Sequence, residues 1–145
     1  MKNILVSGGA GYIGSHTCVE LLKKGFNVCV VDSLINSSEK TISDIKRIID
    51  IDKPCNKGEI FFRKGDLRDK DFLFEIFNYF RNQNKNFDAV IHFAGLKSVE
   101  ESLKNPLDYW NTNINSTITL LEVMDEFKCN CIVFSSSATI YKPQG

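Results

Sequence analysis

A glycine-rich turn near the N-terminus has the residue types and the spacing that bind phosphate groups. Gly8, Gly11 and Gly14 follow a short apolar run and precede a segment of helical periodicity. Gly8 would permit a tight turn, Gly11 would let a pyrophosphate approach the backbone, and Gly14 would let helix and strand pack closely. The free N–H groups and the positive dipole end of the helix would then face the phosphates. Ordinary turns are also rich in glycine, so the prediction of a dinucleotide depends on the position between strand and helix.

An aspartate follows the second apolar run, Asn27 to Val31. Asp32 comes after Gly14 at roughly the 20-residue spacing that places an acidic side chain beside the adenosine ribose. Its carboxylate could accept hydrogen bonds from the ribose hydroxyls and would repel a 2′-phosphate, so we expect NAD rather than NADP. The alternative is an ordinary surface aspartate at the end of a strand.

Three more clusters of polar or small residues follow apolar runs later in the chain. Asp66 and Leu67 could hold the edge and face of an adenine, or could be a turn aspartate and an anchoring leucine. The small residues of segment 93–97 would permit backbone contact with a ligand, and Lys97 could meet a negative group or a polarised hydroxyl. The serines at 135–137 would place a hydroxyl where it could hydrogen-bond a reacting sugar oxygen.

Hydrolase and metal chemistry have little support in the sequence. There is no G-x-S-x-G motif, His92 lies within an apolar run and is expected in the core, and His16 lies on the predicted first helix. The five cysteines include no C-x-x-C pair, and the alternation of Cys129 and Cys131 would put both on one face of a strand. We expect the cysteines to be small buried residues in a reducing compartment, and we expect no metal site.

Regular alternation of strand and helix patterns would position these residues. Apolar runs predict strands over residues 3–7, 27–31, 60–63, 89–93 and 131–135, and helical periodicity predicts helices over residues 12–24, about 38–50, 69–80 and 105 to about 127. In the last helix Asn105 and Pro106 are the expected cap and first residue, and the apolar stripe comprises Leu107, Trp110, Ile114, Ile118 and Leu121. Such alternation indicates an α/β fold, a Rossmann-like doubly wound parallel sheet. Ligands bind at the carboxyl ends of its strands, where the candidate residues lie.

Length and charge narrow the class of protein further. The 145 residues suit one compact domain, and 18 basic residues cancel 18 acidic ones, so no global field favours nucleic acid or an anionic membrane. No apolar run approaches the roughly 20 residues of a membrane span, and the N-terminus enters an apolar strand without a signal-peptide pattern. We therefore expect a cytoplasmic protein that binds neither nucleic acid nor membrane.

Four longer strings carry a resemblance to a known family. SGGAGYIGSHTCVELL, VIHFAGLKSVEES, NPLDYWNTNINST and FSSSATIY resemble, in the correct order, the UDP-glucose 4-epimerase family of the extended short-chain dehydrogenase/reductase superfamily. The combination of HFAGLK with SSSATIY is the most specific part of this resemblance. It implies an isomerase of galactose metabolism that interconverts UDP-glucose and UDP-galactose through transient oxidation at C4 by NAD, and that is a homodimer at full length.

The resemblance also implies roles for individual residues. Ser137 matches the catalytic serine that hydrogen-bonds the sugar 4-hydroxyl, and Lys97 also lies near the substrate. Ser33 stands where asparagine is common, and Lys142 replaces a glycine. The positions expected to bind the cofactor are Gly8, Gly11, Tyr12, Ile13, Gly14, Asp32, Ser33, Leu34, Ile35, Asn36, Ser37, Asp66, Leu67, Phe93, Ala94, Gly95, Leu96, Lys97 and Asn113.

The family's YxxxK motif, whose lysine tunes a tyrosinate base, is not found in the sequence. Tyr141 does not replace it, because the residue four positions later is Gly145. We therefore expect residues 1–145 to be an incomplete NAD-binding domain, cut after about five strands and without the C-terminal substrate domain, and to be inactive alone. A 4-epimerase for UDP-N-acetylhexosamines or UDP-pentoses, or a non-catalytic dinucleotide-binding module, remains an alternative. A 4,6-dehydratase is disfavoured, because Ser137 and Ala138 replace its Asp-Glu pair.

Overall fold

Five parallel strands form the centre of the structure, a computed structural model that describes residues 1–137. The strands are β1 (Asn3–Ser7), β2 (Asn27–Asp32), β3 (Ile60–Lys64), β4 (Ala89–His92) and β5 (Ile132–Phe134). They pair in the order β3-β2-β1-β4-β5, and every pairing is parallel. The strand order reverses between β1 and β4, which is where doubly wound sheets bind their ligands. The predicted fold class is confirmed.

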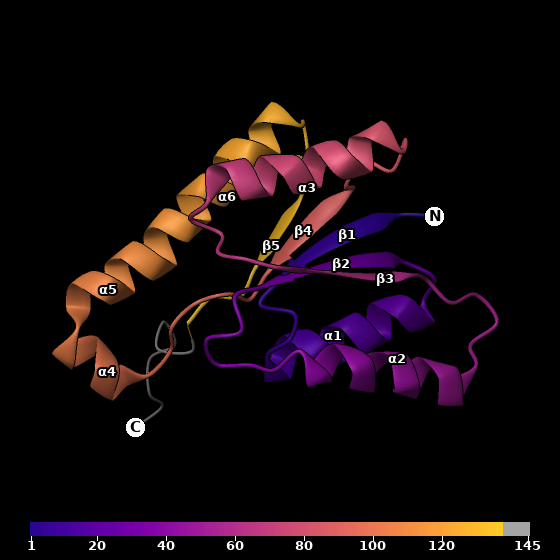
Figure 1. The fold of residues 1–145 in the computed structure, drawn as a ribbon, viewed down its shortest axis with the longest axis horizontal. Coiled ribbons are helices and arrows are strands. Elements are labelled where there is room, and N and C mark those ends of the chain that lie inside the picture. Colours follow the sequence, from indigo (N-terminus) through magenta and orange to yellow (C-terminus); the bar gives the residue numbers. More distant parts are fainter. Residues whose placement is uncertain (138–145) are drawn as a thin grey trace, which may run out of the picture.

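Helices cover both faces of this sheet (Figure 1). Helices α1 (Tyr12–Lys23) and α2 (Lys40–Asp52) lie on one face, and α3 (Lys70–Asn82) and α6 (Ser116–Glu126) lie on the other. The alternation of side chains along β1 divides the core between the two faces. Ile4 and Val6 pack in the cluster under α1 and α2, whereas Leu5 packs in the cluster under α3 and α6.

Local signals set most helix boundaries close to the predicted ones. Asp69 caps α3, because its side chain accepts a hydrogen bond from the Phe72 N–H at 3.0 Å. Pro106 is the first residue of its helix, as predicted, although the Asn105 side chain makes no capping hydrogen bond. Phe93 lies just beyond β4 and so belongs to the loop rather than to the predicted strand.

The long helix predicted from residue 105 has more structure than its periodicity indicates. A separate helix, α4 (Val99–Lys104), precedes it, and the predicted helix itself is divided into α5 (Pro106–Trp110), a π-helical turn η1 (Asn111–Asn115) and α6. Helix α4 begins at a Ser98 cap and has no buried residue, so it leaves no apolar pattern in the sequence. The π-helical turn has no periodic signature either. Figure 1 shows α5 continuing the line of α6 beyond the sheet.

The predicted apolar stripe is not the buried face of this helix. Leu107 and Trp110 are 81% and 65% exposed. The apolar side chains that α6 buries are Leu120, Val123 and Met124. The helix is apolar on more than one side, so its sequence alone did not identify the side that packs on the sheet.

Two other expectations need correction or completion. Cys55 and Cys131 are exposed, whereas Cys18, Cys29 and Cys129 are buried, so the prediction of uniformly buried cysteines is wrong for two of the five. Cys129 and Cys131 both precede β5, so they do not alternate along a strand as predicted. Over residues 1–137, no helix is long and apolar enough to cross a membrane.

Candidate functional site

The glycine turn joins β1 to α1 in a conformation that its sequence requires. Gly8 has φ +71°, and a Cβ there would lie 2.7 Å from the backbone nitrogen of Ala94. A Cβ on Gly14 would overlap the carbonyl oxygen of Gly8 and lie 2.7 Å from the Cα of Gly9. The Gly8 contact matches the predicted tight turn. Gly14 was predicted to let the helix pack closely on the strand, and the close contact that it permits is with Gly8 and Gly9 of the turn after β1.

Open space lies in front of Gly11 at the start of α1. A Cβ on Gly11 would meet only the Gly8 carbonyl oxygen, at 3.2 Å. Helix α1 begins at Tyr12 with no side-chain cap and no acidic residue in its first turn, so its positive end is left uncompensated. An open cavity of about 430 Å³ lies here, between Gly11 and Tyr12 on one side and Asn36 and Ser37 on the other. Backbone amides and open space of this kind fit an anionic group such as a pyrophosphate.

Asp32 connects the glycine turn to the loop that follows β2 through hydrogen bonds. Its Oδ2 accepts a hydrogen bond from the Ala10 N–H at 3.0 Å, and its Oδ1 accepts one from the Leu34 N–H at 2.9 Å and one from the Ser37 hydroxyl at 2.8 Å. Ala10 and Ser37 both line the cavity. A carboxylate has about four acceptor sites, so capacity remains for the hydroxyls of a ligand. Asp32 thus holds the glycine turn and the loop 33–37 together beside the cavity.

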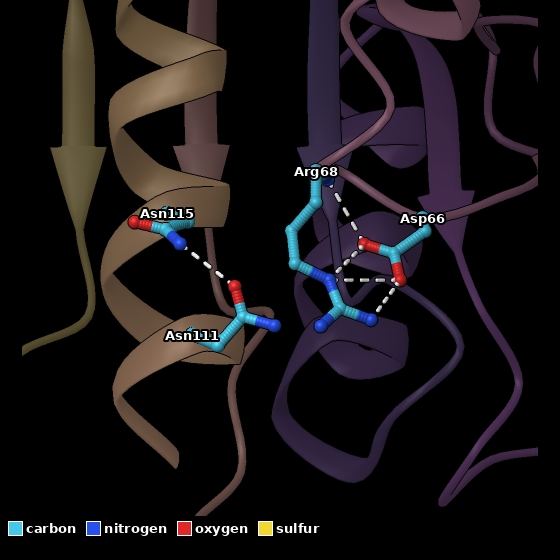
Figure 2. A network of polar contacts seen from close by, with 4 residues as sticks. All are labelled: Asp66, Arg68, Asn111 and Asn115. Atoms are coloured by element: carbon cyan, nitrogen blue, oxygen red, sulfur yellow. Dashed lines mark hydrogen bonds and ion pairs between the residues drawn. The ribbon is translucent and has the colours of Figure 1, made fainter. Parts of the chain in front are cut away.

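Asp66 is held by a residue that the sequence analysis did not single out. Figure 2 shows the Arg68 guanidinium facing the Asp66 carboxylate, with Nη2–Oδ2 at 2.6 Å and Nε 3.1 Å from both oxygens. This pairing lowers the pKa of Asp66 below its usual value. The Leu67 side chain is buried in the core and acts as an anchor, so any contact of Leu67 with a cofactor would involve its backbone. An i, i+2 pair within a turn has no recognised sequence signature.

Asn113, in the middle of η1, clamps the loop after β4. Its Oδ1 accepts a hydrogen bond from the Leu96 N–H at 2.7 Å, and its Nδ2 donates to the Leu96 carbonyl at 2.9 Å. At the other end of this loop, the Phe93 N–H donates to the Ser7 carbonyl at 3.0 Å. Because Ala94 also abuts Gly8, segment 93–97 lies directly beside the glycine turn. The structure therefore brings two of the predicted clusters together.

His92 is buried, as predicted for a core histidine, but it has polar partners that the sequence did not reveal. Its Nδ1 lies 2.6 Å from the Ser7 hydroxyl, and its Nε2 lies 3.0 Å from the Thr117 hydroxyl. Burial lowers the pKa of His92 to about 4, so the ring is neutral near pH 7. Ser7 comes from β1 and Thr117 from α6, so only the folded chain brings the three together.

The first of the serines after β5 is hydrogen-bonded to β4. The Ser135 N–H donates to the His92 carbonyl at 3.0 Å. The 135–137 segment therefore begins at the carboxyl ends of the strands, where the other clusters lie. Tyr141, Lys142 and Gly145 lie outside the described residues. Among residues 1–137 no three His, Cys, Asp or Glu side chains gather as they would around a metal ion.

Strand order and glycine turn together define a Rossmann-like domain of the doubly wound α/β class. Residues 5–142 match the model of a protein family described as GDP-mannose 4,6 dehydratase, and the chain belongs to this family.

Individual relatives are epimerases. The chain is 50% identical over 141 residues to UDP-glucose 4-epimerase 1 of Oryza sativa subsp. japonica, an alignment that covers 97% of this chain and 37% of that protein. The crystal structure of UDP-glucose 4-epimerase from Bifidobacterium longum in complex with NAD+ and UDP is similar with a TM-score of 0.84 and 40% identity, over 97% of this chain and 38% of that one. The structure of the UDP-Glc/GlcNAc 4-epimerase of Campylobacter jejuni is similar with a TM-score of 0.82 and 36% identity. This match covers 100% of this chain and 40% of that one. The chain thus spans less than half the length of these relatives, and the resemblance noted in the sequence is confirmed over that part.

Proposed function

We propose that this chain is the NAD-binding part of a UDP-glucose 4-epimerase, which interconverts UDP-glucose and UDP-galactose by transient oxidation at C4. The proposal depends mainly on the position of Asp32. Its carboxylate joins the glycine turn to the loop 33–37 by hydrogen bonds, beside an open cavity. The relative from Bifidobacterium longum, which has the same fold, was crystallised with NAD+ and UDP.

The residues present fit a dinucleotide at the switch point of the sheet. The first N–H groups of α1 would hold the pyrophosphate in the space that Gly11 leaves open, and Asp32 would accept hydrogen bonds from the adenosine ribose hydroxyls. Asp66, oriented by Arg68, would meet the adenine edge, and segment 93–97 with Asn113 would line the other half of the ligand. When bound, NAD supplies the acceptor for the hydride that leaves C4 of the sugar.

For the sugar, we assign Ser137 as the group that hydrogen-bonds the reacting 4-hydroxyl, with Lys97 nearby. A serine here cannot act as the carboxylic acid that a 4,6-dehydratase needs, which favours epimerisation within this family. The proposed substrate is a UDP-sugar. We also propose that the whole protein is a homodimer in the cytoplasm. Because the Campylobacter jejuni relative is described as a UDP-Glc/GlcNAc 4-epimerase, UDP-N-acetylglucosamine is a second substrate to be tested.

Titration calorimetry with NAD tests the cofactor part of the proposal. Wild-type protein should bind NAD, and Gly11→Val should not, because the branched side chain would enter the space in front of the turn. Ser43→Val, which adds the same side chain at an exposed position of α2, is the control and should bind normally. A wild type that takes up no NAD, or a Gly11→Val protein of unchanged circular dichroism that still binds it, would contradict the proposal.

Chromatography of UDP-galactose incubations tests the activity. The whole protein that carries this sequence should convert UDP-galactose to UDP-glucose, and UDP-N-acetylgalactosamine is assayed beside it. Ser137→Ala should lower kcat by about 30- to 1,000-fold, which corresponds to one positioned hydrogen bond of roughly 2–4 kcal/mol. Its NAD affinity should stay unchanged. Unchanged turnover in Ser137→Ala would contradict the role given to Ser137, and so would a loss of NAD binding that accounts for the whole fall in turnover.

A further inference from the structure

A continuous chain of hydrogen bonds, buried at Ser7 and partly buried at Thr117, runs from β1 through β4 to the helix that holds Asn113. Ser7 Oγ lies 2.6 Å from His92 Nδ1, His92 Nε2 lies 3.0 Å from Thr117 Oγ1, and Thr117 Oγ1 lies 2.7 Å from the Asn113 carbonyl oxygen. Leu5 and Val90 belong to the cluster under α3 and α6, and the two-residue period of a strand puts Ser7 and His92 on this same face.

The direction of each hydrogen bond follows from donor counting. The Asn113 carbonyl can only accept, so the single hydroxyl proton of Thr117 is donated to it. Thr117 therefore accepts from His92, which must carry its proton on Nε2. Nδ1 is then an acceptor, and the Ser7 hydroxyl donates to it. One neutral tautomer of His92 satisfies all three contacts.

The last bond in this chain acts on the π-helical turn. A threonine hydroxyl that bonds the carbonyl four residues earlier bends a helix, and the Thr117–Asn113 bond is of this kind. The same Asn113 whose carbonyl is held in this way presents its side-chain amide to both backbone groups of Leu96. The orientation of η1 and the position of segment 93–97 are thus connected.

We propose that His92 is a positioning residue that, as its Nε2–H tautomer, fixes Thr117 and the π-helical turn so that Asn113 holds segment 93–97 in the form that receives the cofactor. The part played in cofactor binding rests on the proposed function, whereas the hydrogen-bond order does not. Burial of the ring keeps His92 neutral and so keeps Nδ1 able to accept.

Two matched pairs of variants test this role in the whole protein that carries the sequence. Thr117→Val removes the hydroxyl at nearly constant volume, whereas Thr117→Ser keeps it. His92→Gln places an N–H donor near the former Nε2, whereas the shorter His92→Asn does not reach Thr117. Val123→Ala, in the buried apolar face of α6, destabilises the same helix without touching a polar group of the chain.

The measurements are the NAD dissociation constant and, without NAD, amide hydrogen exchange at Leu96 and the 15N shifts of the His92 ring. We expect the Nε2–H tautomer in the wild type. Thr117→Val removes the hydroxyl that donates to the Asn113 carbonyl and leaves the His92 Nε2–H unpaired, and His92→Asn removes the donor that orients Thr117. Both should weaken NAD binding by about 10- to 100-fold and speed exchange at Leu96. Thr117→Ser, His92→Gln and Val123→Ala should change the dissociation constant less than about threefold.

Three results would overturn the role of His92. They are a wild-type ring protonated on Nδ1, unchanged exchange at Leu96 in both Thr117→Val and His92→Asn, and a loss of NAD affinity in Val123→Ala equal to that in Thr117→Val. If Thr117→Val does not fold, the two His92 variants decide between the outcomes. A wild type that binds no NAD contradicts the proposed function instead, and exchange at Leu96 together with the ring shifts still decides the hydrogen-bond order.

Discussion

Replacing Asp32 with asparagine should weaken the glycine turn and relax the preference for NAD at the same time. The carboxylate uses both oxygens: Oδ1 accepts from the Leu34 N–H and the Ser37 hydroxyl, and Oδ2 accepts from the Ala10 N–H. Asparagine has one oxygen. If that oxygen takes the place of Oδ1, the new NH2 group faces the Ala10 N–H, and two donors oppose each other.

The size of both effects follows from this geometry. One hydrogen bond to a charged acceptor is worth roughly 1.5–3 kcal/mol, so the free energy of unfolding should fall by about 2 kcal/mol. Two unit charges 4 Å apart interact by about 1 kcal/mol in water and about 4 kcal/mol at an effective dielectric constant of 20. Asp32 is half-buried, so removal of its charge should favour a 2′-phosphate by about 2 kcal/mol. The ratio of NAD to NADP affinity should then fall by about 30-fold.

Calorimetric titration of wild type and Asp32→Asn with NAD and with NADP measures the ratio, and urea denaturation measures the stability. Asp44→Asn is the matched control, because it removes the same charge from α2, where Asp44 forms an ion pair of 3.2 Å with Arg47. The reasoning is refuted if wild type binds both cofactors equally or if Asp32→Asn leaves the ratio unchanged. An equal effect of Asp44→Asn would show that net charge, not the site, sets the preference.

Three further comparisons test the packing and the pH dependence of the domain. Gly14→Ala should prevent stable folding, because its Cβ would overlap a backbone carbonyl of the turn, while Gly11→Ala should keep the wild-type circular dichroism spectrum. Phe80→Ala should cost about 3–5 kcal/mol in urea denaturation, and the more exposed Phe74→Ala clearly less. The pKa of His92 is lowered from 6.5 to about 4, so the unfolded chain binds more protons between these values. Stability should therefore fall by about 3 kcal/mol from above pH 6.5 to below pH 4, and the difference between wild type and His92→Gln should show this slope.

The order of elements could be predicted because each strand and helix has its own local signal. Apolar runs closed by Gly8 and Asp32, a cap at Asp69 and a proline at the first position of α5 mark boundaries that need no distant partner. The residues at the carboxyl ends of the strands could be predicted for the same reason, since the topology of a parallel sheet brings these ends to one edge.

What could not be predicted depends on contacts between distant segments. Which side of α6 is buried depends on what packs against it, and apolar residues lie on more than one side of this helix. Helix α5, which contains Trp110, buries no residue. The partners of His92 come from a strand 85 positions earlier and a helix 25 positions later. Arg68 turns toward Asp66 within a loop of no regular periodicity, and the resemblance alone pointed to Asn113.

The sheet divides the apolar core into two clusters that share no residue. Energetic coupling between substitutions needs contact or a shared partner, so changes such as Ile45→Ala under α2 and Phe80→Ala under α3 should have additive effects on the free energy of unfolding. The face that supports the glycine turn and the cavity can then accumulate substitutions independently of the other face. Substitutions deep under α3, away from Thr117 and segment 93–97, should therefore change the overall stability of the domain without repacking the side chains beneath the glycine turn.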